Sequence, residues 1–266
     1  MMKLSIIGFG HMGSAIIAGA VKAGVIGSGD VTVAEKSADI AEKAKKLGLN
    51  VTDNACAAVA DSTVVIVAVR PADLESLAKD IAASIPTDAV IVSICAGKRL
   101  DTLNGFFGNR AKIVRVMPNT PALVGEGMSA ICGNENVSKS DLALVLEIFR
   151  SFGRAEIMPE ELFDCVTAVS GSGPAYVYSF INALKAYAEE QGMSPEQATV
   201  FAAQTTLGAA KMVLSVDETP AKLKANVCVP NGTTIEAVNV LDANGFEGII
   251  KDAAKACEKR SAELAK

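Results

Sequence analysis

The first residues with the types and spacing to do chemistry form a glycine-rich segment near the start of the chain. Gly8, Gly10 and Gly13 make a G-x-G-x-x-G pattern that directly follows the apolar run Leu4–Ile7. In this pattern the first glycine makes a tight turn, the second lets a pyrophosphate approach the backbone, and the third permits close helix–strand packing. The pattern alone is weak evidence. Its position between a predicted strand and a predicted helix, however, predicts a dinucleotide site.

A polar cluster ends the second predicted strand. Glu35, Lys36 and Ser37 follow the apolar residues Val31–Val33 closely. A carboxylate here would bind a ribose 2′-hydroxyl and favour NAD, whereas a basic or hydroxyl residue would favour the 2′-phosphate of NADP. Glu35 favours the first cofactor, and Lys36 and Ser37 favour the second. The sequence therefore leaves the choice between NADH and NADPH open, with a solvated strand end as the plain alternative.

The single histidine, His11, lies inside the glycine segment. The carboxylates nearest to it in the sequence are Asp30 and Glu35. We expect His11 to lie beside the pyrophosphate, far from a nicotinamide ring, and not to act as a catalytic acid. Because the six cysteines form no C-x-x-C pair and there is only one histidine, no metal site is predicted.

Three further segments place small or turn-forming residues where a ligand would bind. Residues 115–121 (RVMPNTP) form a stiff turn after a buried strand, at the end where open α/β sheets bind ligands. Residues 170–176 (SGSGPAY) begin a long helix and permit close approach of another backbone. Residues 230–234 (PNGTT) precede another helix, whose first amides would bind a carboxylate. An ordinary helix cap is the alternative for that last segment.

The elements that must position these residues change in kind along the chain. Up to about residue 158, buried apolar runs alternate with amphipathic stretches, which predicts βαβ units in a mostly parallel, doubly wound sheet of Rossmann type. From residue 159 the pattern is helical, with interruptions at Gly, Pro and Asn. We therefore predict an α/β dinucleotide-binding domain over residues 1–158 and an all-α domain over residues 159–266.

The elements of each domain follow from these patterns. The predicted strands are Leu4–Ile7, Val31–Val33, Val64–Val69, Val90–Ile94 and Ile113–Val116, with Met128–Cys132 and Ala155–Met158 as weaker candidates for the sheet edge. The predicted helices are Met12–Ala23, Ile40–Leu47, Phe163–Val169, Ala175–Gln191, Pro195–Val216, Lys222–Val227, Thr233–Leu241 and Phe246–Ala265.

Composition excludes several classes of protein. Half of the 266 residues are apolar, which is too many for a disordered chain. The net charge of −5 and the absence of a Lys/Arg run argue against nucleic acid as a partner. The longest apolar runs are about half the roughly 20 residues that a membrane span needs. The start Met1-Met2-Lys3 does not resemble a signal peptide, so we expect a cytoplasmic protein with reduced cysteines.

The helical half contains many small residues. Gly208-Ala209-Ala210 is one example within a predicted helix. Small side chains allow helices to approach closely, and this half has little chain with which to bury its own apolar surface. We therefore expect it to pack against a second subunit in a homodimer.

Together these segments resemble pyrroline-5-carboxylate reductase, the last enzyme of proline biosynthesis. The resemblance runs over the whole chain and includes the glycine pattern and residues 68–71 (AVRP), 93–97 (SICAG), 117–121 (MPNTP), 170–176 (SGSGPAY), 204–212 and 226–234. The last stretch is the most specific, although Val229 and Asn231 stand where the family usually has Ser and Gly. Because Asn tolerates a positive φ better than other non-glycine residues, we expect the turn to be kept.

The resemblance implies a reductase that uses NADPH or NADH to convert the cyclic imine 1-pyrroline-5-carboxylate into L-proline. It implies a Rossmann domain followed by a helical dimerisation domain, often assembled into rings of dimers. It places the cofactor against Ile7, Gly8, Phe9, Gly10, His11, Met12, Glu35, Asn54, Ala68, Val69, Arg70, Pro71, Ile94, Cys95 and Ala96, to which the chemical argument above adds Lys36 and Ser37. The family often has a small hydroxyl residue where this chain has Glu35.

The resemblance also implies the substrate site. It places substrate or proline against Glu160, Asn226, Thr233 and Thr234, and the helix-start argument adds the amide of Gly232. Thr234 is expected to hydrogen-bond the ring nitrogen. Glu160 is expected to stabilise an iminium or to relay a proton, with a solvated glutamate at a helix start as the alternative.

Two other functions fit part of the pattern. A β-hydroxyacid dehydrogenase has a similar layout, but its catalytic lysine follows a Gly-x-Gly segment, and here the fourth residue after Gly173 is Val177. The nearest lysine, Lys185, lies two helical turns further on. A non-catalytic dinucleotide-binding protein is the second alternative, against which Thr234 and its turn argue.

Overall fold

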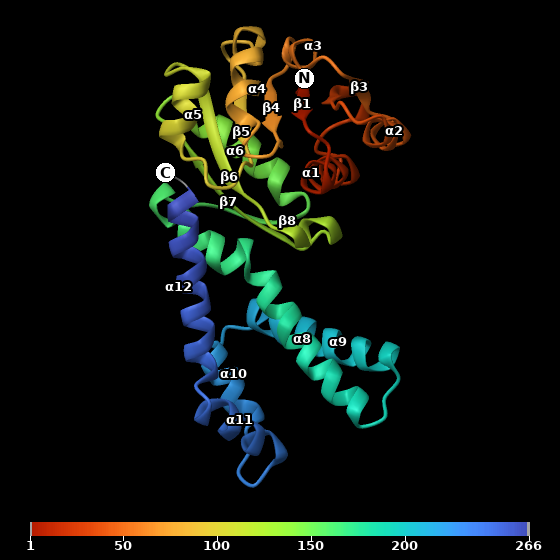
Figure 1. Ribbon diagram of the computed structural model, residues 1–266, viewed down its shortest axis with the longest axis vertical. Coiled ribbons are helices and arrows are strands. Elements are labelled where there is room, and N and C mark those ends of the chain that lie inside the picture. Colours follow the sequence, from red (N-terminus) through yellow and green to blue (C-terminus); the bar gives the residue numbers. More distant parts are fainter. Residues whose placement is uncertain (1, 265–266) are drawn as a thin grey trace. The chain divides into compact units, whose positions relative to one another are not determined.

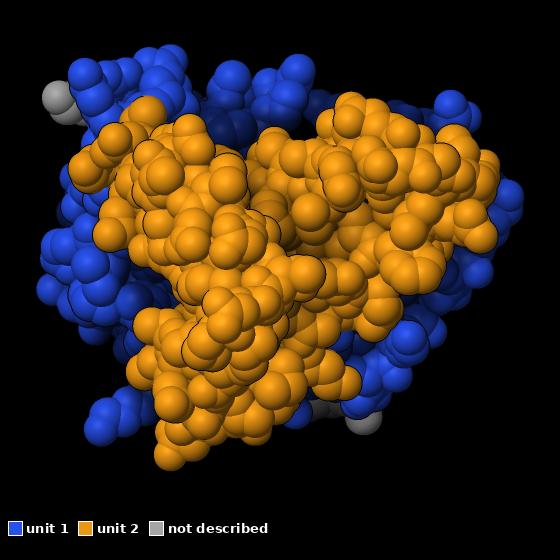
Figure 2. All heavy atoms as spheres, turned by 90° about the horizontal axis from the view of Figure 1, so that it is seen from below, with its two compact units in different colours: residues 1–172, 257–266 blue, residues 173–256 orange. Residues whose placement is uncertain are grey.

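The computed structural model describes residues 2–264, which divide into two compact units (Figures 1 and 2). The first unit contains residues 2–172 together with 257–264, and the second contains residues 173–256. Strands alternate with helices only as far as strand β8 (Gly153–Ile157), which ends before the first unit does. After β8 the chain forms helices and turns. Residue 158 thus marks the end of the sheet, whereas the compact units separate at residue 172.

The described part of the first unit contains one sheet of eight strands in the order β3-β2-β1-β4-β5-β6-β7-β8. Strands β1 to β6 are parallel, β7 is antiparallel to β6, and β8 is parallel to β7. The mostly parallel, doubly wound sheet is therefore confirmed, and its switch point lies between β1 and β4. Besides β8, the strands are β1 (Leu4–Ile7), β2 (Val31–Ala34), β3 (Asn50–Thr52), β4 (Val64–Val67), β5 (Val90–Ser93), β6 (Lys112–Met117) and β7 (Gly127–Gly133).

Both faces of the sheet are buried under helices (Figure 1). In β4, Val64 and Ile66 join a core with α1 and α6, whereas Val65 and Val67 join a second core with α3, α4 and α5. Each fully buried side chain of this size contributes about 1.5–3 kcal/mol. The helices are α1 (His11–Lys22), α2 (Ala38–Lys46), α3 (Ala55–Val59), α4 (Leu74–Ile81), α5 (Leu100–Phe107) and α6 (Lys139–Arg150), with 3-10 turns at Ser28–Asp30, Ala82–Ser84, Thr120–Val124 and Glu160–Leu162.

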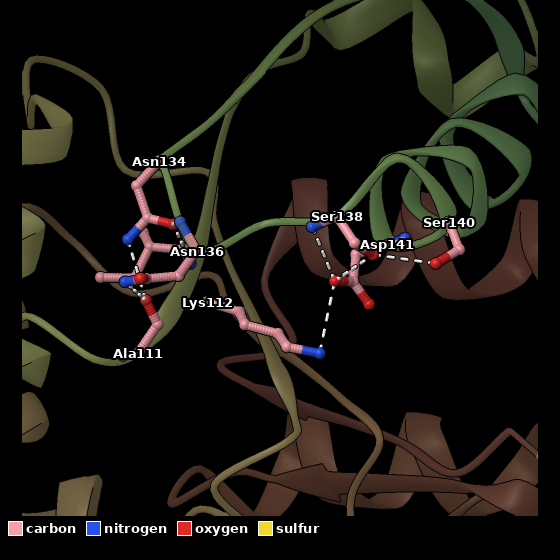
Figure 3. Close-up of polar contacts among 8 residues, drawn as sticks. Ala111, Lys112, Asn134, Asn136, Ser138, Ser140 and Asp141 are labelled. Atoms are coloured by element: carbon pink, nitrogen blue, oxygen red, sulfur yellow. Dashed lines mark hydrogen bonds and ion pairs between the residues drawn. The ribbon is translucent and has the colours of Figure 1, made fainter.

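A polar cluster fixes the corner between β6, β7 and α6 (Figure 3). The Ser138 hydroxyl accepts a hydrogen bond from the Asp141 amide, and the Asp141 carboxylate accepts one from the Ser138 amide, which makes a capping box. Lys112 Nζ lies 3.3 Å from Asp141 Oδ2. Beside them, the Asn134 amide donates to the Ala111 carbonyl at 2.8 Å. This corner lies at the amino end of β6, away from the glycine loop, so it stabilises the fold.

Residues 159–264, as far as they are described, form helices and turns without strands, as predicted. The helices are α7 (Phe163–Val166), α8 (Gly173–Glu190), α9 (Pro195–Ser215), α10 (Pro220–Val227), α11 (Thr233–Ala243) and α12 (Phe246–Leu264), with a π-helix at Thr167–Gly171. The predicted α-helix Phe163–Val169 is wrong at its end, because the backbone changes to π geometry at Thr167. The predicted last residue of the final helix, Ala265, lies outside the described residues.

Helix α12 begins in the second unit and ends in the first. In the first unit, Ser261 donates to the Asp164 carboxylate at 2.6 Å, and Cys257 Sγ lies 3.2 Å from Ser172 Oγ. The two places where the chain leaves and re-enters the first unit therefore lie next to each other.

Candidate active site

The glycine loop connects β1 to α1 at the switch point of the sheet. Gly8 has a φ of 90°, and a Cβ on it would lie 2.7 Å from the Ala68 carbonyl oxygen. A Cβ on Gly13 would lie 2.5 Å from the Gly8 carbonyl oxygen. A Cβ on Gly10, by contrast, would meet no protein atom within 4 Å. The first and third glycines are thus required by the fold, and the second faces space that a ligand would fill.

The start of α1 fits the phosphates of a dinucleotide. Gly10 occupies the N-cap position without a side-chain cap, and the first turn contains no acidic residue. The first amides of a helix have no partner inside the helix and attract anions. His11 is the first residue of α1 and is exposed.

Strands β2 and β3 bring polar residues next to the glycine loop. The Glu35 carboxylate accepts one hydrogen bond from the Phe9 amide at 2.9 Å and another from the Ser37 amide at 2.8 Å. After β3, the Asn54 side chain accepts from the Ala57 amide at 3.0 Å and so caps α3. Lys36 is exposed beside them.

The segments after β4 and β5 line a pocket of about 440 Å³ within the first unit. Pro71 and Ala96, both predicted to contact the cofactor, line it together with Thr167 and Ser172. The Cys95 thiol donates to the Val69 carbonyl at 3.3 Å and so joins the two segments. Burial raises the pKa of Cys95, which keeps it a neutral thiol. The pocket lies at the carboxyl ends of the parallel strands, where such sheets bind ligands.

The turn after β6 is tied to the π-helix. Asn119 is buried; its side chain accepts from the Met128 amide at 2.8 Å and donates to the Ser170 carbonyl at 3.1 Å. A Cβ on Gly171 would lie 2.6 Å from Met117 Cε, so the small residue permits this contact. Asn119 therefore fixes the segment that leads into α8, a role that the sequence did not reveal.

Glu160 lies in a partly buried ion pair of the first unit. Its Oε1 accepts from Arg115 Nη1 at 2.8 Å and from the Leu100 amide at 2.7 Å. The Arg115 guanidinium also stacks over the Phe163 ring, 4.6 Å from its centre. Nearby, burial and the Glu160 carboxylate raise the pKa of Cys132 to about 12. The Oε1 atom of Glu160 thus joins α5, β6 and the chain after β8.

The loop before α11 has the backbone shape expected from its sequence. Asn231 has a φ of 59°, so the predicted turn is kept with Asn in place of Gly. The Gly232 amide donates to the Val229 carbonyl at 3.0 Å, and a Cβ on Gly232 would lie 2.7 Å from Val229 Cγ2. Gly232 also caps α11 without a side-chain hydrogen bond, and Thr233 and Thr234 follow in the first turn. The amides of these threonines have no partner inside the helix.

The second unit adds a carboxylate that the sequence reasoning missed. Asn226 donates from its side chain to Glu218 Oε2 at 2.9 Å. Glu218 precedes α10 by two residues, and only its pairing with Asn226 in the structure draws attention to it.

The structure brings the predicted cofactor residues together at the carboxyl edge of the sheet, in the loops after β1 to β5. Of the predicted substrate residues, Glu160 lies in the first unit, whereas Asn226, Gly232, Thr233 and Thr234 lie in the second. No group of three or more His, Cys, Asp or Glu side chains in the described residues is arranged to hold a metal ion. No described helix is long and apolar enough to cross a membrane.

Comparisons with known proteins agree with this arrangement. A family model described as pyrroline-5-carboxylate reductase dimerisation matches residues 160–264, and one described as NADP oxidoreductase coenzyme F420-dependent matches residues 3–97. Pyrroline-5-carboxylate reductase of Escherichia coli K12 is 42% identical over 265 residues, covering 99% of this chain and 98% of that protein.

Solved structures agree as well. The Plasmodium falciparum pyrroline carboxylate reductase, crystallised with NADP bound, is 32% identical with a TM-score of 0.89 and covers 100% of this chain and 98% of its own. The Coxiella burnetii pyrroline-5-carboxylate reductase is 30% identical with a TM-score of 0.93, covering 100% of this chain and 99% of its own. The resemblance drawn from the sequence motifs is thus confirmed, and this chain belongs to the pyrroline-5-carboxylate reductase family.

Proposed function

We propose that this chain reduces 1-pyrroline-5-carboxylate to L-proline, the last step of proline biosynthesis, with NADPH or NADH as hydride donor. Family membership over the full chain and the dinucleotide loop support this function. The observation that carries it is the start of α11, where the helix has no side-chain cap and Thr234 stands in the first turn. That arrangement suits a small ligand with a carboxylate next to a ring nitrogen.

The first unit would hold the cofactor. The open space at Gly10 and the uncapped start of α1 fit a pyrophosphate, and the pocket at Pro71 and Ala96 fits the nicotinamide end. When bound, the reduced cofactor supplies the hydride that the imine carbon receives. The chain itself contributes position and a fixed electrostatic environment.

The second unit would hold the substrate. Because the Gly232 amide is already used in the turn to Val229, we assign the carboxylate to the amides of Thr233 and Thr234, with Gly232 supplying the tight turn. The Thr234 hydroxyl would hydrogen-bond the ring nitrogen. An imine is basic enough to gain its proton readily, so the reaction needs no strong side-chain acid.

For Glu160 the contacts support a positioning role. Its bonds to Arg115 and to the Leu100 amide are those of a residue that holds three elements together. A direct role in proton relay remains a prediction that Glu160→Gln tests. A relay predicts that the pH profile of kcat changes, whereas positioning alone predicts a change in stability with the profile kept.

The second unit would form a homodimer, as the name of the matched dimerisation family indicates. Large apolar side chains are exposed on it, among them Tyr178, Tyr187, Val200, Phe201 and Leu207. Exposed apolar surface of this extent marks an interaction site. Assembly of such dimers into a ring is a further expectation that light scattering of the purified protein tests.

The experiment that tests the function follows nicotinamide oxidation by the purified protein with pyrroline-5-carboxylate, and uses a β-keto acid as control substrate. We expect turnover with the pyrroline, L-proline formed in equal amount to the oxidised cofactor, and no turnover with the β-keto acid. Cofactor binding without turnover would instead indicate a binding protein. Turnover with the β-keto acid alone would indicate a hydroxyacid dehydrogenase.

A further inference from the structure

Glu35 holds a fixed position at the end of β2. One of its carboxylate oxygens accepts from the Phe9 amide at 2.9 Å and the other from the Ser37 amide at 2.8 Å. Its own amide donates to the Thr52 carbonyl at 3.0 Å. The carboxylate is therefore held between the glycine loop and the start of α2.

This position is where the adenosine ribose of a dinucleotide lies. In Rossmann folds an acidic residue about 20 residues beyond the glycine motif binds the ribose 2′-hydroxyl. Glu35 comes 22 residues after Gly13 and directly follows β2, the strand paired with β1. A carboxylate oxygen bonded to one amide still has a lone pair for a hydroxyl donor.

A 2′-phosphate would meet unfavourable groups at the same place. Amides at a helix start commonly bind phosphate, but here the Phe9 and Ser37 amides are already used by Glu35. A phosphate monoester carries a charge of about −1.5 to −2 near pH 7, which the Glu35 carboxylate would repel. The first turn of α2 adds a second carboxylate, Asp39. The exposed Lys36 is the neighbouring positive charge.

We propose that Glu35 makes NADH the preferred cofactor of this chain by binding the ribose 2′-hydroxyl and excluding the 2′-phosphate. The proposal rests on the dinucleotide use proposed above and resolves the choice that the sequence left open. It also separates this chain from the Plasmodium falciparum relative, whose structure contains NADP.

Direct binding tests the proposal without relying on catalysis. Isothermal titration of the purified protein would use ADP-ribose and 2′-phospho-ADP-ribose, which differ only in the phosphate. We expect the wild-type chain to bind ADP-ribose at least about tenfold more tightly. Glu35→Gln, which removes the charge, and Glu35→Ser, which removes the carboxylate, should both reduce this ratio to about threefold or less. Asp39→Asn, which removes the exposed carboxylate in the first turn of α2, is the matched control and should change the ratio by less than about twofold.

Each of the following results would overturn the proposal. Equal or tighter binding of 2′-phospho-ADP-ribose by the wild-type chain would do so without any variant. An unchanged affinity ratio in a folded Glu35 variant would show that Glu35 does not select between the two compounds. If Asp39→Asn changed the ratio as much as the Glu35 variants do, the selection would come from the overall negative charge of this region and not from Glu35. If neither compound binds, the assignment of a dinucleotide site to the glycine loop is itself wrong. Turnover of pyrroline-5-carboxylate with NADPH in preference to NADH would overturn the preference and leave the proposed reaction intact.

Discussion

At the scale of single residues, the loop before α11 depends on one backbone conformation. Asn231 has a φ of 59°, in a region that residues other than Gly, Asn and Asp seldom occupy. The sequence predicted this turn, because Asn is a tolerated replacement for Gly. The use of the Gly232 amide inside the turn was not predictable, since it depends on where the Val229 carbonyl points.

We predict that Asn231→Val distorts the loop and that Asn231→Gly does not. A β-branched side chain at this φ costs about 1–2 kcal/mol, which the loop would relieve by moving the start of α11. Steady-state kinetics should show kcat/KM for pyrroline-5-carboxylate lowered about 5- to 30-fold in Asn231→Val, with the affinity for the cofactor unchanged. Equal kinetics for both variants would contradict this.

We also predict that Thr234→Ala lowers kcat/KM about 5- to 150-fold. This is the effect of losing one hydrogen bond of about 1–3 kcal/mol to the ring nitrogen. Fluorescence titration of the reduced cofactor should give an unchanged Kd. Thr233→Ala is the control, because it keeps the backbone amide assigned to the carboxylate. A Thr234 variant with wild-type kinetics would remove this hydroxyl from the mechanism.

At the scale of elements, the buried strands and the long helices after residue 172 were predicted, whereas strand β3 and the helices α3, α4, α5 and α6 were not. Strand β3 has only Asn50–Thr52 and α3 only Ala55–Val59, which is too little sequence for a period to show. Helices α4 and α6 do have a helical period in the sequence: Leu74, Ala78 and Ile81 are buried on α4, and Val145, Ile148 and Phe149 are buried on α6. The π-helix at Thr167–Gly171 leaves no simple period in the sequence.

The capping box of α6 should make stability depend on pH. Burial acts to raise the pKa of Asp141, but the Ser138 hydroxyl and amide and the Lys112 ammonium outweigh it, so the pKa lies below its ordinary value of 3.8. Since the folded pKa is lowered, the stabilisation is complete above pH 3.8 and is lost as the pH falls through the folded pKa.

Asp141→Asn should therefore lower the free energy of unfolding by about 1 kcal/mol near neutral pH. Urea unfolding at several pH values should show this difference hold down to about pH 5 and shrink below about pH 4. The control Asp53→Asn removes an exposed carboxylate and should change little. A difference that stays constant down to acid pH would contradict the role of the carboxylate.

At the scale of the whole molecule, the sequence predicted an α/β part followed by a helical part, which is the observed order. It did not predict that the last turns of α12 belong to the first unit, because no local pattern distinguishes residues 257–264 from the rest of that helix. Nor can a sequence alone show which apolar side chains the folded chain leaves exposed.

We predict that Phe201→Glu prevents dimer formation. Phe201 lies on α9 with 63% of its surface exposed, and a dimer with two-fold symmetry would bury it twice. Losing about 1.5–3 kcal/mol per buried phenylalanine should weaken the dimer at least about a hundredfold. Light scattering should show a monomer at micromolar concentration. Leu47→Glu, which changes an exposed residue of the first unit, should leave the dimer intact.

The return of α12 to the first unit has a consequence for how the chain is made. The ribosome releases the amino end first, yet the hydrogen bond from Ser261 to Asp164 joins residues separated by 97 positions. The dinucleotide-binding unit is therefore not completed when its sheet has emerged, but only after residues 257–264 have been synthesised. A gene fragment that stops at residue 158 or 172 would encode the strands without the segment that closes the pocket at Pro71, Ala96 and Ser172.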